Sequence, residues 1–496
     1  MKRPYQTALV VILAFLLCFA GCGKKESKNN SSSQTSKVTS KAVTGSTTLS
    51  LPCVSNKSFN PYTTDSMTNL ELWPLFYDCL AEPDQNFNPV LRLASAVSSQ
   101  NNVFTVTLRS GVVFSDGSPL TAADVKYSFE LAMGNTGGYF YPRVSNIANI
   151  ETSGNDIIFN LKTSDPLLTN LLNLPILKQE TGTSDTPTGS GIYKLASSGT
   201  DVITLTANSL WYKKTTPNLK TIRLVNIPDK NALMSSLEIG NIDFLHSDYG
   251  SGMQSSVNVS SKPVSMNQLI FIGVNSTRSP LNNVHLRKAV SYAVNRDSLV
   301  TEIYSGRTLS SILPLYPNLT GLKSTDKSKL KSDSDSFKNE LKSFGSTSSL
   351  DLALLVNQDN SVRALAADYL VSNLRKAGLN ISVEKVTSQV YNSRITSGNF
   401  DLYLGEVKLR SDMDLSSFLQ SGGSSYGIGQ KTATLTAYNN WRNGNGTLDA
   451  FAAAFENEMP FIPLCYKTGA VSYHTGLSGV VSTDGNLFYN IETWHF

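Results

Sequence analysis

Two aspartates lie close to a tight turn in residues 114–129, FSDGSPLTAADVKYSF. Paired carboxylates can serve as a general acid and base or as metal ligands, so the segment raises the question of an active site. Asp116 falls in a Ser-Asp-Gly turn, where an aspartate can bond its own backbone and glycine permits a positive φ. Asp124 follows Thr121 at the spacing of a helical capping box. Each acid therefore has a structural explanation, and we interpret the segment as scaffold.

A serine nucleophile is a second chemical hypothesis. Residues 423–427, GSSYG, fit the G-x-S-x-G pattern of a serine hydrolase, and Asp449 and His474 follow in the matching order. A nucleophile elbow needs a strand before the serine and a helix after it, and neither flank has that pattern. We therefore expect no enzyme and no catalytic residues, with a serine hydrolase as the least favoured alternative.

Histidines and cysteines do not form a metal motif. None of the four histidines stands at a ligand spacing such as His-Glu-x-x-His, and the three cysteines after residue 22 are irregularly spaced. We expect these cysteines to be small buried hydrophobes, and we expect no resident metal and no other cofactor. The sequence also has no Walker loop, so an ATPase partner would be a separate chain. The histidines are His246, His285, His474 and His495.

The first 22 residues read as a bacterial lipoprotein signal. Two basic residues precede an apolar run from Ala8 to Ala20, which is short for a membrane span and typical of a secretory signal. Residues 19–22, Phe-Ala-Gly-Cys, resemble a lipobox, so Cys22 is predicted to carry lipid, including palmitate. Ordinary cleavage near Ala20 is the alternative. Residues 23–47 are polar and predict a flexible tether.

Charge is unevenly distributed along the chain. The formal net charge is +4, but the signal and tether hold seven basic residues and one acid, which leaves 35 basic and 37 acidic residues in the rest. Because the rest of the chain is nearly neutral, it does not show the excess of basic residues that is typical of nucleic-acid-binding proteins. The N-terminal lysines favour an anionic membrane surface instead, and we expect attachment to the outer face of the cytoplasmic membrane.

The 496 residues exceed what one hydrophobic core usually supports, so two or three domains are expected. Alternating apolar residues predict a strand over 102–109, and Val125, Phe129 and Ala132 have helical spacing. In the second half, a strand, a helix and a strand in succession predict a βαβ unit. Residues 323–349 are polar and predict a surface excursion. The other predicted elements are helix 286–294, strand 350–356, helix 362–377 ending at Gly378, strand 379–383 and strand 400–407.

Residues 108–125, LRSGVVFSDGSPLTAADV, resemble the signature "LR.GV.FSDG.PLTA.DV" of the family 5 extracellular solute-binding proteins. These are the peptide- and nickel-binding receptors of ABC importers. Residues 286–296, LRKAVSYAVNR, are similar to the family's "VRQALAYAIDR", and residues 460–466, PFIPLCY, are similar to "P.IPLYY". The resemblance covers nearly all of the mature chain.

The resemblance implies an α/β fold of the two-lobed, periplasmic-binding-protein-like kind, type II and of the large peptide-binding class, with a hinge and an interlobe cleft. Lobe I would comprise residues 48–268 and 462–496, with a subdomain at about 62–183. Lobe II would comprise residues 269–461. We expect a monomer.

In oligopeptide-binding relatives, an aspartate just after a strand pairs with the α-amino group of the peptide. The matching region here is 405–419, GEVKLRSDMDLSSFL, where the usual "GW..DYPDP" pattern is altered and Glu406 stands where tryptophan is common. Asp412 and Asp414 are both candidates for the amine. The alternative is that they are solvated loop acids capping a helix that starts near Leu415. Arg410 could meet a ligand carboxylate.

Aromatic side chains are further candidates for the ligand site, since they combine apolar contact with a polar tip. Tyr466 matches a family position that borders the cleft. For each aromatic residue taken singly, core packing is the alternative explanation. The candidates are Trp73, Tyr141, Tyr426, Trp441 and Tyr466.

These observations together predict a substrate-binding lipoprotein of an ABC importer. It would capture short peptides and deliver them to a membrane permease that works with separate ATPase subunits. A receptor for a nickel chelate or an oligosaccharide is the alternative within the family. A sensor or adhesin that keeps the fold without transport is not separated from an importer by the residues alone.

Overall fold

The computed structural model describes residues 45–247, 258–322, 327–345, 350–419 and 426–496, which form a mixed α/β fold. Within these ranges, no helix is both long and apolar enough to cross a membrane. Two large clusters of buried hydrophobic side chains make up most of the described core, and a third cluster is small.

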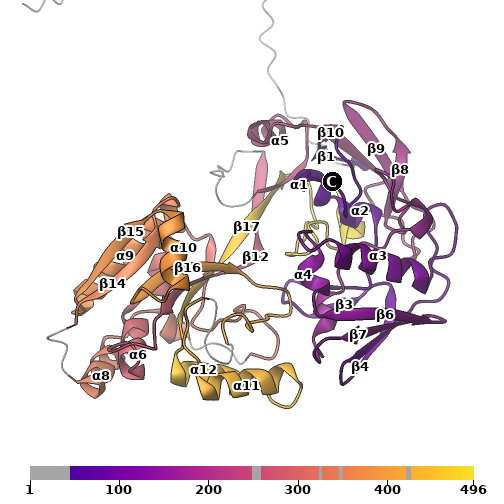
Figure 1. Cartoon of the computed structure of the whole chain (residues 1–496). Helices are drawn as coiled ribbons and strands as arrows, with labels where there is room; N and C mark the ends of the chain where they lie inside the picture. Colours follow the sequence, from indigo (N-terminus) through magenta and orange to yellow (C-terminus); the bar gives the residue numbers. More distant parts are fainter. Residues whose placement is uncertain (1–44, 248–257, 323–326, 346–349, 420–425) are drawn as a thin grey trace, which may run out of the picture. The chain divides into compact units, whose positions relative to one another are not determined.

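The first large cluster is built on two four-stranded sheets, ordered β1-β10-β9-β8 and β4-β5-β7-β6 (Figure 1). In β5 (Val103–Leu108), Phe104, Val106 and Leu108 are buried and the residues between them are less so, which confirms the strand predicted over 102–109. The other strands of this part are β1 (Thr48–Cys53), β2 (Ala81–Pro83), β3 (Pro89–Leu91), β4 (Ala94–Gln100), β6 (Ile147–Ser153), β7 (Asp156–Leu161), β8 (Tyr193–Ser197), β9 (Val202–Ala207) and β10 (Thr221–Asn226).

Helix α3 (Ala122–Gly134) packs on β6 and β7. The predicted capping box is present, because the backbone N–H and hydroxyl of Thr121 donate to Oδ2 of Asp124 at 2.9 and 2.7 Å. The other oxygen of Asp124 accepts from the N–H of Gln179 at 3.0 Å. Asp116 accepts from the N–H of Ser118 at 2.9 Å, as its turn requires. The carboxylates of Asp116 and Asp124 are thus engaged in hydrogen bonds that support the turn and the start of α3.

Replacing Asp124 with alanine is expected to lower the free energy of unfolding by about 1–2 kcal/mol, because the helix cap and the bond to Gln179 are lost together. Urea denaturation followed by circular dichroism measures this. Asp116→Ala is the matched control in the exposed turn and should cost less. Loss of ligand affinity at an unchanged denaturation midpoint would contradict the structural role of Asp124.

The second part of the chain is organised by a seven-stranded sheet. Its order is β11-β17-β12-β16-β14-β15, and β13 also pairs with β17. β14 pairs in parallel with both β15 and β16, while β12 runs antiparallel to β16 and β17. The strands are β11 (Phe244–Ser247), β12 (Val259–Val274), β13 (Thr308–Ser310), β14 (Leu352–Asn357), β15 (Ile381–Val386), β16 (Leu402–Lys408) and β17 (Ile462–His474).

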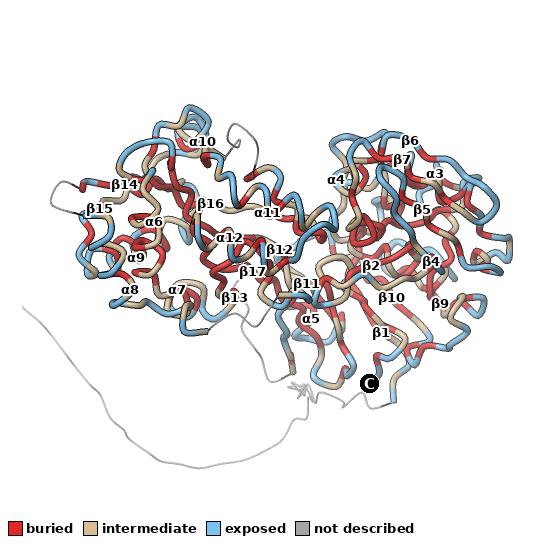
Figure 2. The backbone as a smooth tube through the Cα atoms, turned by 90° about the horizontal axis from the view of Figure 1, so that it is seen from below, coloured by how far each residue is buried: buried red, intermediate tan, exposed pale blue. Residues whose placement is uncertain are grey.

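The two longest strands, β12 with 16 residues and β17 with 13, connect the two large clusters. Val264 of β12 and Val471 of β17 belong to the first cluster. Leu269 of β12 and Leu464 of β17 belong to the second. Figure 1 shows the pair side by side, and Figure 2 shows their buried positions. The predicted lobe boundaries and the hinge stay predictions.

The predicted βαβ unit is confirmed. Helix α9 (Ser361–Ala377) joins β14 to its parallel neighbour β15, and it ends at Gly378 in the left-handed conformation, with φ of 106°. Helix α10 (Ser388–Thr396) then joins β15 to β16 on the other side of β14. Because parallel crossovers are right-handed, α9 and α10 cover opposite faces of the sheet.

Two interpretations from the sequence are wrong. Part of the supposed surface excursion at 323–349 is helix α8 (Ser334–Phe344), which packs on α6 (Val284–Ala293) and buries Phe337. Its polar composition reflects a helix with one buried face. No helix starts in the described residues 415–419 either, since the carboxylate of Asp414 accepts from the N–H of Ser416 and residues 416–418 form a turn.

The cysteines behave as predicted, because Cys53, Cys79 and Cys465 are buried and unbridged. The remaining helices are α1 (Met67–Leu70), α2 (Trp73–Phe76), α4 (Tyr141–Val144), α5 (Leu233–Glu238), α7 (Arg296–Glu302), α11 (Thr432–Arg442) and α12 (Leu448–Glu458). Short 3-10 turns are η1 (Leu168–Leu171), η2 (Gln179–Thr181), η3 (Lys230–Ala232), η4 (Lys327–Leu330) and η5 (Ile491–Thr493).

Candidate functional site

The parallel strands of the second part define a topological switch point. The chain passes from β14 to β15 on one side and then returns to β16 on the other. Open α/β sheets bind ligands outside the carboxyl ends of their strands at such a point. The segment that follows the carboxyl end of β16 contains Arg410, Asp412 and Asp414. The switch point is therefore the candidate site, and the predicted charged residues follow it directly.

Asp412 is the most enclosed of these residues. Its side chain has no solvent exposure, and its Oδ2 lies 2.9 Å from Nη2 of Arg410 and 2.8 Å from Nη2 of Arg442. The same Nη2 of Arg442 is 3.0 Å from Oδ1 of Asp165. Burial opposes the charge of Arg442, but the carboxylates of Asp412 and Asp165 outweigh it and raise the pKa of the guanidinium.

Residues 409–414, which we name the β16 loop, are attached to segments of the first part. The amide nitrogen of Asn170 donates to the carbonyl of Phe87 at 2.8 Å and to that of Ser411 at 3.3 Å. Nη1 of Arg410 donates to the carbonyl of Pro142 at 3.2 Å. The ion pair between Arg442 and Asp165 adds a charged contact. The loop therefore contacts residues of the first part as well as residues of the second.

Asp414 is more accessible than Asp412, with 22% of its side chain exposed. Its Oδ1 accepts from Oη of Tyr438 at 2.7 Å, and its Oδ2 lies 2.9 Å from Nη2 of Arg410. Burial would raise the pKa of Asp414, yet Arg410 and the hydrogen-bond donors lower it. Asp414 is thus a partly solvent-exposed carboxylate whose charged form is favoured.

A second charged group lies just before the loop, and the sequence did not identify it as a site. Glu406 of β16 keeps only 9% of its side chain exposed. Its carboxylate is 2.7 Å from Nη2 of Arg363 and 2.6 Å from Nζ of Lys467, and it accepts a hydrogen bond from Nε2 of Gln268. Burial would raise the pKa of Glu406, but the two cations lower it. We name Gln268, Arg363, Glu406 and Lys467 the Glu406 cluster.

A comparison with models of known protein families identifies the family of this chain. Residues 87–430 match the model of the bacterial extracellular solute-binding proteins, family 5, in its middle region. The chain belongs to this family. It is accordingly a solute-binding protein of the peptide and nickel class and not an enzyme.

The proteins similar to this family 5 protein include some named for peptide binding and some named for nickel transport. It is 24% identical to the oligopeptide-binding protein OppA of Bacillus subtilis over 352 residues, which cover 62% of this chain and 64% of OppA. The chain thus matches just under two thirds of that relative's length. Among solved structures, the unliganded open form of the murein tripeptide-binding protein MppA superposes with a TM-score of 0.76 at 17% identity, covering 91% of this chain and 97% of MppA.

A nickel ABC transporter protein from Bacillus halodurans gives a TM-score of 0.75 at 17% identity, covering 89% of this chain and 97% of that one. At such identities the structures show the fold alone. They confirm the predicted mixed α/β solute-binding fold over about nine tenths of the family 5 protein.

The predicted aromatic residues of the second part pack in the core. Tyr466 is fully buried edge-on to Tyr316, with ring centroids 5.5 Å apart. Tyr426 stacks on Phe418 at 4.3 Å. Trp441 stacks on Phe451 at 5.7 Å and precedes the arginine that pairs with Asp412. Their ligand roles stay predictions, since packing accounts for each ring in this conformation.

The two predicted aromatic residues of the first part lie around Phe140. Trp73 is buried with its ring edge-on to that of Phe140, 6.4 Å between centroids. Tyr141 begins α4 and is partly buried against the first cluster. It adjoins Pro142, whose carbonyl accepts from Arg410 of the β16 loop. Cys22 and Ser425 lie outside the described residues.

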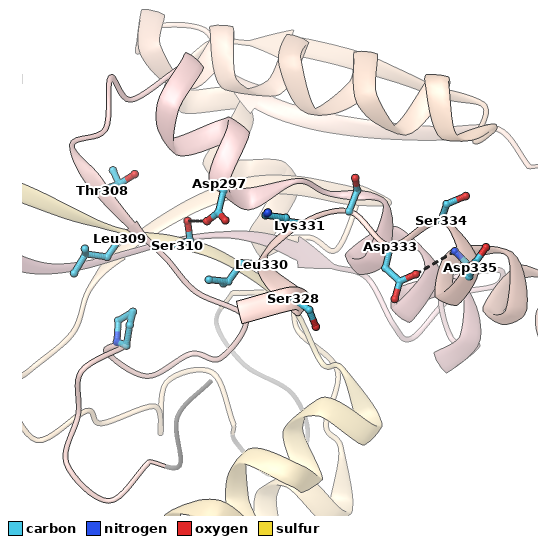
Figure 3. A pocket seen from close by; sticks show the side chains of 12 residues that line it. Asp297, Thr308, Leu309, Ser310, Ser328, Leu330, Lys331, Asp333, Ser334 and Asp335 are labelled. Carbon is cyan, nitrogen blue, oxygen red and sulfur yellow. Dashed lines mark hydrogen bonds between the residues drawn. The ribbon is translucent and has the colours of Figure 1, made fainter. Parts of the chain in front are cut away.

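One cavity is separate from these residues. It measures about 900 Å³ and is lined from α7, β13, η4 and the start of α8 (Figure 3). In Figure 3, Asp297 points toward Ser310, whose hydroxyl donates to it at 2.7 Å, and Lys331 lies nearby. None of the predicted ligand residues lines this cavity. Its wall contains three carboxylates and one lysine.

A cavity of about 40 Å³ in the first part encloses an unusual acid. Trp73 lines it together with Asp78, whose carboxylate accepts from Nε1 of Trp211 at 3.2 Å and from Oγ of Ser190 at 2.9 Å. Burial raises the pKa of Asp78 from its ordinary 3.8 to about 7, and these two donors only partly offset the effect.

Asp78→Asn is expected to remove a pH-dependent loss of stability. The raised pKa means that the folded protein binds a proton more tightly than the unfolded chain. The stabilisation is therefore complete below about pH 4 and is lost as pH rises to about 7. Between pH 5 and 8, the unfolding free energy of Asp78→Asn relative to wild type should rise by about 2–3 kcal/mol. Denaturation at several pH values measures this, and a constant difference would contradict the buried-acid assignment.

Proposed function

We propose that the family 5 protein is the substrate-binding lipoprotein of an ABC importer and that its ligand is a short peptide, held at the carboxyl edge of β14 and β16. The oligopeptide-binding relative from Bacillus subtilis and the murein tripeptide-binding protein of similar fold support the choice of peptide. Peptide would pass to a permease in the membrane, driven by ATPase subunits on separate chains.

The observation that carries the proposal is the charge of the groups around the β16 loop. Two guanidinium groups, of Arg410 and Arg442, face three carboxylates, of Asp165, Asp412 and Asp414. The formal charges of these five groups sum to −1, while burial raises the pKa of Asp165 above its ordinary value. An ammonium group restores neutrality at this edge, and the α-amino group of a peptide supplies it.

Asp414 is the better partner for the amine. The carboxylate of Asp412 is enclosed and bound by two arginines, so an amine would first have to displace one of them. Asp414 shares one arginine and keeps solvent access. We assign Asp414 to the ligand and Asp412 to the support of the β16 loop, where it orients Arg410 and Arg442.

This assignment separates the two aspartates in one experiment. Titration calorimetry with a pool of short peptides should show binding, and N-acetylation of the pool should weaken it. Asp414→Asn should weaken binding of the free-amine pool by roughly 2–5 kcal/mol while the protein stays folded. Asp412→Asn should instead lower stability by about 3–5 kcal/mol, because it leaves buried arginines without their partner.

Two results would contradict the proposal. If acetylated and free peptides bind equally well, the amine is not recognised. If no peptide binds in either form, the ligand class is wrong.

A nickel chelate is the second candidate, because the nickel transporter protein of Bacillus halodurans has a similar fold. Among the residues described, no three His, Cys, Asp or Glu side chains are grouped closely enough to hold a metal ion. Nickel would therefore have to arrive with ligands of its own. Titration with nickel chloride alone and with nickel premixed with free histidine distinguishes this candidate from a peptide.

The lipid anchor is proposed at Cys22, which lies outside the described residues. Cys22→Ala should move the protein from the membrane fraction into the medium, or leave a precursor that keeps residues 1–22. Cell fractionation with immunoblotting measures this. Cys53→Ala, which removes a buried cysteine instead, should leave the fractionation unchanged. A Cys22→Ala chain of mature length that still fractionates with membranes would contradict the anchor.

A further inference from the structure

The tip of the β2–β3 hairpin contains a buried aromatic residue in a strained conformation. Phe87 has a φ of 61°, in the left-handed region that glycine adopts freely and that a bulky side chain rarely enters. Its neighbours Gln85 and Asn86 are exposed, yet only 3% of Phe87 is exposed. Such a conformation persists where the surroundings offset its cost, so the contacts of the ring must stabilise it.

The ring is buried in the core of the other part of the molecule. Phe87 belongs to the second large cluster, whose other buried members among the described residues all lie between Leu269 and Tyr466. It meets the ring of Tyr316 edge-on, with centroids 4.7 Å apart, and Tyr316 in turn contacts Tyr466 of β17. The hairpin itself packs on η1 of the first part. Phe87 therefore joins a hairpin of the first part to the second core.

The turn that presents the ring is held by bonds of its own. The carboxylate of Asp84 accepts from the N–H groups of Asn86 and Asn88 at 2.8 and 2.9 Å, and from Nδ2 of Asn88 at 3.0 Å. The N–H of Phe87 donates to the carbonyl of Asp84 at 3.1 Å. All four bonds stay within the hairpin, so the turn can keep its shape when the ring leaves the second core.

The same place in the fold attaches the β16 loop. The amide nitrogen of Asn170 that donates to the carbonyl of Phe87 also donates to the carbonyl of Ser411. Asn170 is buried. One side chain thus bonds to both the hairpin tip and the loop, and we expect the loop to loosen when the hairpin leaves the second core.

The charged groups of the candidate site depend on this docking. Arg410 donates to the carbonyl of Pro142 at 3.2 Å, and Arg442 pairs with Asp165 at 3.0 Å. Both partners belong to the first part. If the first part moves away from the loop, each guanidinium loses one partner, and the surroundings of Asp414 change.

We propose that Phe87 is a latch, which docks the β2–β3 hairpin in the second core and thereby holds the first part against the β16 loop. It is then a positioning residue for Arg410 and Arg442. Removing a phenylalanine ring from water shifts an equilibrium by roughly tenfold to a hundredfold. The latch is a property of the ligand-free protein, and only its effect on peptide binding rests on the proposed function.

The test is hydrogen exchange of the ligand-free protein under native conditions, followed by mass spectrometry. Phe87→Gly removes the ring and relieves the backbone, since glycine accepts a φ of 61° without strain. Amides of the β16 loop should exchange about tenfold faster or more than in wild type, because the docked state is less populated. Amides in the centres of β5 and β14 should keep their wild-type rates.

Matched variants separate the ring from the turn. Asn86→Gly introduces a glycine at the exposed neighbouring position and keeps the ring, so loop exchange should stay at the wild-type rate. Tyr316→Leu removes the partner ring and should accelerate the same amides as Phe87→Gly. The double variant should exceed the larger single effect by less than about twofold, because both substitutions remove one contact.

Peptide binding tests the positioning role. Titration calorimetry with a pool of short peptides should give an affinity about threefold or more weaker for Phe87→Gly, since undocked molecules lack the complete charged group. Saturating peptide should slow the exchange of the β16 loop in Phe87→Gly toward the wild-type rate, because the ligand favours the docked form.

Each outcome decides the inference. Unchanged exchange of the β16 loop in Phe87→Gly overturns the latch, as does faster exchange confined to residues 84–88. Equal acceleration in β5 and β14 also overturns it, because Phe87 would then contribute only to global stability. Faster loop exchange with unchanged peptide affinity overturns the positioning role. Failure of every peptide to bind wild type overturns the proposed function, while exchange of the ligand-free protein still decides the latch.

Discussion

The antiparallel pairing of β12 with β17 is the constraint on which the described fold depends. The two strands are hydrogen-bonded from Val259 opposite His474 to Ile272 opposite Ile462, with two interruptions of register. A register slip of one residue would turn every side chain to the opposite face, and here it would damage two cores at once. The pair therefore fixes which side chains of each core face one another. It also sets the position of Lys467 relative to β16, and hence the shape of the Glu406 cluster.

Arginines serve two distinct purposes around this framework. Arg296 and Arg287 are buried and donate to backbone carbonyls, among them those of Pro463 and Met459. Burial without a paired carboxylate lowers the pKa of each to about 10. Both belong to the stretch that resembles the family signature, so that part of the signature marks scaffold. The arginines beside the β16 loop differ, because they face carboxylates at the switch-point edge.

The sequence predicted the regular elements well because their signals are local. The alternation in β5 and the glycine after α9 each follow from a few neighbouring residues. Helix α8 was missed because its single buried aromatic, Phe337, sits in a polar run. The Glu406 cluster could not be foreseen from spacing, since its other members lie 43, 61 and 138 residues from Glu406 along the chain and only the folded sheet brings them together. The one local sign was a glutamate that directly follows the buried, mostly apolar residues 402–405 of β16. Asp412 and Asp414 likewise look equivalent in sequence, and Arg442, thirty residues later, makes them different.

The β16 loop is held largely through main-chain oxygens. Asn170 donates to the carbonyl of Ser411, Arg442 donates to the carbonyl of Asp412, and Asn267 donates to the carbonyls of Leu409 and Arg410. A carbonyl is present whatever side chain its residue carries. Substitutions at loop positions whose side chains make no such attachment can therefore change the exposed groups while leaving the path of the loop intact. Such an attachment allows receptors to diverge in specificity during evolution, one side chain at a time, without a new fold for each nutrient.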